Sequence, residues 1–148
     1  MADSKLATIL PHALAIFCGY IGWYISTFIA IFLSGAYRPD KKFDVMNGLF
    51  SFITFLLLGA LLGFLFNKLG WKLGLSLASF VIIVWGFVFG VHIFWGVRTA
   101  FSDTTSFEGF IRLILYTFPE LIGGCLGAYL GAESRNRRTH KGDYQTNF

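Results

Sequence analysis

The chain has 148 residues, a formal net charge of +4, 55% hydrophobic residues and only 14% charged residues, with a mean hydropathy of +0.65. This composition is too apolar for a soluble domain of that length, and it excludes a separate extramembrane enzyme domain. The basic residues flank apolar stretches and do not alternate with aromatic residues, so anionic lipid headgroups are the expected partner and nucleic acid is not.

Four apolar stretches predict four transmembrane helices, each longer than the ~20 residues that cross a bilayer. The fourth stretch contains Arg112 and Glu120, and Thr105 with Glu108 forms a capping box at its start. The chain is therefore predicted to be an all-α integral membrane protein, a single antiparallel four-helix bundle in which consecutive helices pack together. The predicted helices are about 8–35, 44–66, 72–97 and 106–132, within a domain 1–134 and followed by a tail, 135–148, too short to fold.

Lysine and arginine are more frequent on the side that holds both termini and the second loop. The positive-inside rule then favours both termini in the cytoplasm, with the inverted orientation as the alternative. With no transit peptide, a bacterial inner membrane is the expected location. The basic residues of the tail are expected to contact anionic lipids, or alternatively a cytoplasmic partner: Arg135, Arg137, Arg138 and Lys141.

Glycines four residues apart recur in three of the predicted helices, where they permit close backbone approach. They either close the bundle of one chain or form an interface in a homo-oligomer or with other membrane subunits. The residues concerned are Gly59, Gly63, Gly86, Gly90, Gly123, Gly127 and Gly131.

The fourth predicted helix carries a polar face. Arg112, Tyr116 and Glu120 lie within an arc of roughly 100° together with its glycine series. An ionisable group near mid-bilayer is costly unless shielded, so this face is predicted to point into protein or water. Pro119 lacks an amide hydrogen and predicts a kink beside Glu120. Glu120, Arg112 and Tyr116 are thus candidate proton- or cation-coupling residues, with Glu120 as the group that titrates. Alternatively, Glu120 only stabilises the packing of the helices.

His92 is a further candidate coupling residue, because its predicted depth matches that of Asn47 and Arg112 in one polar cluster. A lone histidine among aromatic residues also fits a structural role. Cys18 and Cys125 lie in apolar spans and are interpreted as packing residues. No spacing of metal ligands and no nucleophile–base motif occurs, so no metal, cofactor or enzyme activity is expected.

Three functions remain open at this stage. The preferred one is a structural or accessory subunit of an oligomeric membrane complex, assembled through the glycine series. The first alternative is a minimal oligomeric transporter or channel coupled to protons or cations through Glu120. The second is a pore-forming effector or holin-like protein.

Overall fold

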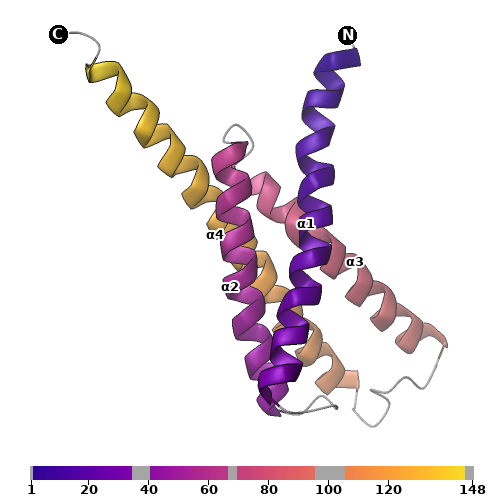
Figure 1. Cartoon of the computed structure of the whole chain (residues 1–148). Helices are drawn as coiled ribbons and strands as arrows, with labels where there is room; N and C mark the ends of the chain where they lie inside the picture. The colour runs from indigo at the N-terminus through magenta and orange to yellow at the C-terminus, as the bar shows by residue number, and fades with distance from the viewer. Residues whose placement is uncertain (1, 35–40, 67–69, 96–105, 146–148) are drawn as a thin grey trace.

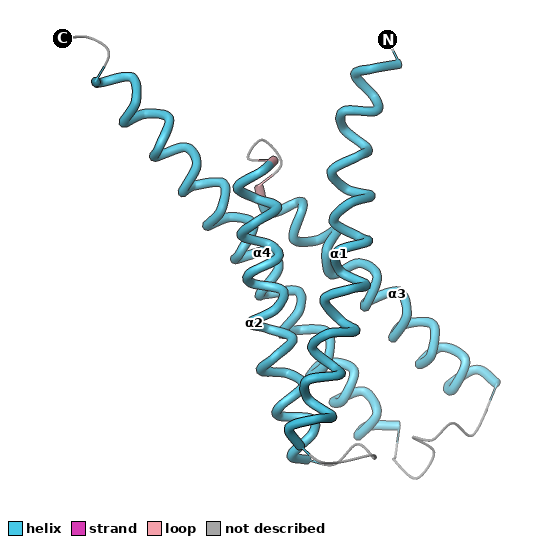
Figure 2. Tube along the Cα trace, viewed as in Figure 1, coloured by secondary structure: helices cyan, strands magenta, loops and turns pink. Residues whose placement is uncertain are grey.

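A computed structural model of the protein describes the backbone of residues 2–34, 41–66, 70–95 and 106–145 and the side chains within 9–34, 44–66, 70–87 and 114–138. In these ranges the chain forms four α-helices and no strand, as predicted (Figure 1, Figure 2). The helices are α1 (Ala2–Ser34), α2 (Lys41–Leu65), α3 (Trp71–Trp95) and α4 (Ser106–Gln145).

Within the described residues, two helices are long and apolar enough to cross a membrane by length and composition. These are the stretches Ile9–Ser34 in α1 and Asp44–Leu65 in α2. In α3 the described apolar stretch, Trp71–Phe87, is shorter. A membrane location is therefore weakly supported by the helices themselves.

Helix α4 is longer than the sequence predicts. It starts at Ser106, as expected, but continues to Gln145, so the prediction that the tail is too short to fold is wrong. A tail that extends an existing helix needs no new helical nucleus, which is the costly step for a short isolated peptide. An ion pair from Glu133 to Arg137, one turn apart with 3.0 Å between Oε1 and Nε, adds local support.

Two of the three consecutive helix pairs, α1–α2 and α3–α4, pack together as predicted. Helix α2 packs most extensively against α4, and α1 also packs against α3, whereas α2 and α3 touch only slightly. The expectation that every consecutive pair packs together is therefore wrong for α2 and α3. The α2 and α4 helices run parallel, since Ser51 faces Glu120 while Gly63 faces Ala128 farther along both helices. In Figure 1, the start of α1 and the end of α4 lie at the same end of the bundle.

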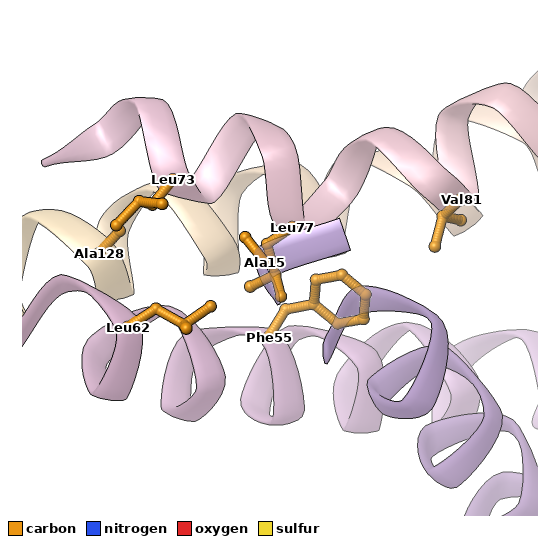
Figure 3. Close-up of a cluster of buried hydrophobic side chains, with 7 residues drawn as sticks. All are labelled: Ala15, Phe55, Leu62, Leu73, Leu77, Val81 and Ala128. Carbon is orange, nitrogen blue, oxygen red and sulfur yellow. The ribbon is translucent and has the colours of Figure 1, made fainter. Parts of the chain in front are cut away.

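An apolar core fills the half of the bundle nearer the α2–α3 connection. Side chains from all four helices meet there: Ala15, Phe55, Leu62, Leu73, Leu77, Val81 and Ala128 (Figure 3). Toward the other end, a smaller cluster places Ala30 of α1 against Tyr116 of α4. Between and beside these apolar contacts lies a set of buried polar side chains.

Candidate functional site

The centre of the polar interior is Glu120 on α4. Its side chain is 1% exposed, and neither carboxyl oxygen has a hydrogen-bond partner within the described residues. The Ser51 hydroxyl of α2 faces this carboxyl, but the two do not meet the geometry of a hydrogen bond. Burial of a carboxyl without a hydrogen-bond partner lowers the stability of the folded protein. A role in helix packing therefore does not explain why this residue is present.

The hydroxyls beside Glu120 form a directed chain. Ser26 Oγ of α1 donates to the carbonyl oxygen of Trp23 at 3.0 Å, and it also lies 3.1 Å from Ser51 Oγ. A serine hydroxyl has one hydrogen, and the Trp23 carbonyl takes that of Ser26. The hydrogen between the two serines therefore comes from Ser51. Ser51 then presents only lone pairs to the Glu120 carboxyl.

Two further buried oxygens, near Ser26 and Ser51 in sequence, lack partners among the described side chains. Asn47 Oδ1 on α2 and Thr27 Oγ1 on α1 are both fully covered and unbonded, and Asn47 as a whole is 4% exposed. Asn47 stands one helical turn before Ser51, and Thr27 follows the serine that contacts Ser51. Among the described side chains, the buried oxygens of Glu120, Asn47 and Thr27 are thus left without hydrogen-bond partners.

Tyr116 covers the site at the end nearer the start of α2. Its phenol donates a hydrogen bond to a carboxylate oxygen of Asp44, and its side chain is 3% exposed. Its ring stacks on Trp85 of α3 with 5.1 Å between centroids and 20° between planes. Tyr116 therefore ties α4 to both neighbouring helices. It makes no hydrogen bond to Glu120, the residue with which the sequence grouped it.

Most of the predicted glycine series lies inside the chain itself. A Cβ at Gly59 would be 2.5 Å from the carbonyl oxygen of Gly124, and one at Gly123 would be 2.6 Å from that of Phe52. Gly63, Gly127 and Gly131 are likewise buried against backbone of the facing helix, in the α2–α4 contact. Gly86 differs, because it is exposed and nothing lies within 4 Å of its missing Cβ.

The tail arginines occupy three different environments. Arg135 Nη1 donates to the carbonyl oxygens of Phe64 at 3.0 Å and Leu65 at 2.6 Å, which caps the end of α2. Arg138 lies over the Phe64 ring, 5.5 Å from its centroid, and Arg137 is 78% exposed in its pair with Glu133. Only the last two project toward the surroundings of the bundle.

Four predicted positions fall outside the description of side chains. His92 and Gly90 belong to the final part of α3, Arg112 to the first part of α4 and Lys141 to its last turns. Their proposed roles stay predictions. Of the three residues in the expected polar cluster, Asn47, His92 and Arg112, the structure describes the side chain of Asn47.

Sequence reasoning missed several residues of the site: Ser26, Thr27, Asp44, Ser51 and Trp85. The signal was present on α2, where Asp44, Asn47 and Ser51 are spaced by three and four residues and so share one helical face. Ser26 and Thr27 stand side by side in an otherwise apolar helix.

No protein family, curated protein or solved structure matches the chain. The function is therefore argued from the site alone.

Proposed function

We propose that this protein is a four-span integral membrane protein that moves protons across the bilayer by reversible protonation of Glu120. The observation that carries the proposal is the Glu120 carboxyl, 1% exposed and without a hydrogen-bond partner among the described residues. When protonated, this carboxyl has one hydrogen to donate, and Ser51 offers the lone pair that receives it. The chain from Glu120 through Ser51 and Ser26 to the Trp23 carbonyl is then complete.

The depth of Glu120 fits this role. It lies about 21 Å along α4 from Ser106, at 1.5 Å per residue, which is near the midpoint of the predicted span 106–132, about 39 Å long. Loss of the proton would leave a charge in a region where charge is costly, unless water or a cation enters with its release. Glu120 can therefore gain or lose its proton only when water from one of the two aqueous phases reaches its carboxyl group.

The proposed topology places the beginning of α1 and the end of α4 on the cytoplasmic side of a bacterial inner membrane. Their common end of the bundle supports an even number of spans (Figure 1). Exposed Arg137 and Arg138 at that end suit an anionic leaflet, and the charge bias of the loops gives the direction. Arg135 is assigned to α2, not to lipid, because of its two bonds to carbonyls.

A matched pair of variants tests the function. Glu120→Gln keeps the shape of the side chain but removes its ability to ionise, whereas Glu133→Gln makes the same change at a half-exposed site on the same helix. Each full-length protein is reconstituted into liposomes that enclose a pH-sensitive dye, and an imposed pH gradient drives flux. Glu120→Gln is expected to abolish the flux, and Glu133→Gln to leave it unchanged. Equal flux from the two variants would contradict the proposal.

A second candidate, a subunit of an oligomeric membrane complex, is favoured by one observation. Gly86 is exposed on α3 beside the exposed side chains of Ile83 and Phe87, so a partner helix could approach its backbone closely. The other described members of the predicted glycine series are buried inside the chain, so Gly86 on α3 is the member that supports this candidate. Native mass spectrometry of Gly86→Leu and wild-type protein tests it, and an unchanged stoichiometry would remove its support.

A further inference from the structure

The oxygens around Glu120 suggest which ion, besides the proton, the site accepts. Protonation gives Glu120 a single hydrogen, which can satisfy Ser51 but leaves Asn47 Oδ1 and the second carboxyl oxygen without donors. Amide and carboxylate oxygens are ligands that hard cations prefer. A bound cation would satisfy all of these atoms at once.

The helix register places Asn47 and Ser51, which carry two of these oxygens, on one face of α2 within about one helical turn of each other. On α2, Asp44 contacts Tyr116 and Ser51 faces Glu120, so the face that carries these residues is turned toward α4. Asn47 lies on the same face between them, three residues after Asp44 and four before Ser51. Asn47 therefore stands about 6 Å along the axis from Ser51, four residues at 1.5 Å each, on the face that is turned toward α4.

The charge of the site fixes the charge of the ion. Helix α1 contributes only the neutral Ser26 and Thr27 at this level, and the titratable groups among the described side chains nearby are Tyr116 and Asp44, which are bonded to each other. Within its described part, α3 brings the Trp85 ring there and has its titratable residue, Lys72, at its opposite end. Among the described side chains, Glu120 is thus the carboxylate that faces these oxygens without a hydrogen-bond donor of its own. A monovalent cation neutralises it, whereas a divalent one would leave a net charge in the bilayer interior.

We propose that Na⁺ and a proton compete for this site, with Glu120, Asn47 Oδ1 and Ser51 Oγ as protein ligands of the ion. The exchange is balanced: the protonated carboxyl plus Na⁺ gives the sodium carboxylate plus a released proton. The inference rests on the proposed proton-binding function of Glu120. It adds that Na⁺ on one side of the membrane can be traded for protons on the other.

The test uses the full-length protein in nanodiscs of neutral lipid. Titration with NaCl, with choline chloride at equal ionic strength as the reference, is followed by calorimetry and by the protons released into weak buffer. Wild-type protein is expected to bind one Na⁺ with release of up to one proton. Its apparent affinity is expected to fall up to tenfold for each unit by which the pH is lowered. Glu133→Gln should match the wild type.

Three variants locate the ion. Glu120→Gln and Asn47→Leu are expected to lose saturable Na⁺ binding, and Asn47→Asp, which keeps an oxygen at that position, to retain it. If Asn47→Leu does not fold, Asn47→Asp still tests the assignment of Asn47 as a ligand. Loss of Na⁺ binding in a folded Asn47→Asp protein would contradict that assignment. Na⁺ binding that survives Glu120→Gln would overturn the inference.

The outcomes separate the two proposals. Glu120-dependent proton flux in liposomes without any Na⁺ effect would overturn the sodium inference and leave the proposed function intact. Flux that is unchanged in Glu120→Gln would overturn the proposed function, and the sodium inference with it.

Discussion

The α2–α4 contact makes a quantitative prediction at Gly59. In Gly59→Ala, the new Cβ would lie 2.5 Å from the Gly124 carbonyl oxygen and 3.0 Å from the amide nitrogen of Ala128. Favourable carbon contacts begin near ~3.5 Å, so the two helices have to separate by up to about 1 Å. Both opposing atoms are backbone, which cannot rotate away as a flexible side chain can. Overpacking of this kind costs about 1–3 kcal/mol.

Gly86→Ala is the matched control for this prediction. Nothing lies within 4 Å of its new Cβ, and alanine favours a helix over glycine by up to about 1 kcal/mol, so its stability should be unchanged or slightly higher. Unfolding of each purified protein in mixed micelles, driven by SDS and followed by tryptophan fluorescence, gives the two free energies of unfolding. The reasoning would be refuted if Gly59→Ala were as stable as Gly86→Ala.

Three other predictions use the same preparations. Arg135→Leu removes two hydrogen bonds to the end of α2 and should lower the free energy of unfolding by about 1–2 kcal/mol. Its control, Arg137→Leu, breaks an exposed ion pair and should lower the free energy of unfolding by less than about 0.5 kcal/mol. Tyr116→Phe keeps the ring stack but loses the hydrogen bond to α2, so a loss of about 1 kcal/mol is expected, and an unchanged unfolding midpoint would argue against that bond. In intact cells, Cys18 and Cys125 should not react with a membrane-impermeant maleimide. A cysteine introduced by Arg137→Cys should react only after the cells are permeabilised. Labelling of that cysteine in intact cells would show that the proposed topology is inverted.

Much of the helical architecture follows from hydropathy alone. Long uncharged stretches predict where α1, α2 and α3 lie, because backbone groups in an apolar phase must be satisfied within the segment. The 3.6-residue period also places Tyr116 and Glu120 on the same buried face of α4, as the structure has them. These are properties of single helices, and a single sequence is sufficient for them.

The partners of those faces could not be predicted in the same way. Which helix covers Glu120 depends on how closely two backbones approach, and the glycines of α2 and α4 could equally have served two different chains. The hydrogen bond from Tyr116 to Asp44 joins residues far apart in sequence, so no local pattern reports it. Arg135 likewise resembles any basic residue beside a membrane helix until α2 ends next to it.

The parallel pairing of α2 with α4 has a consequence for biosynthesis. Because α4 follows the other three helices in the chain, the surface of α2 that carries Gly59 and Gly63 meets its partner only after α4 has been synthesised. Until then that surface is not covered by α4. A nascent chain that stops before α4 should be recognised by proteases, so the synthesis of α4 decides whether the first three helices persist.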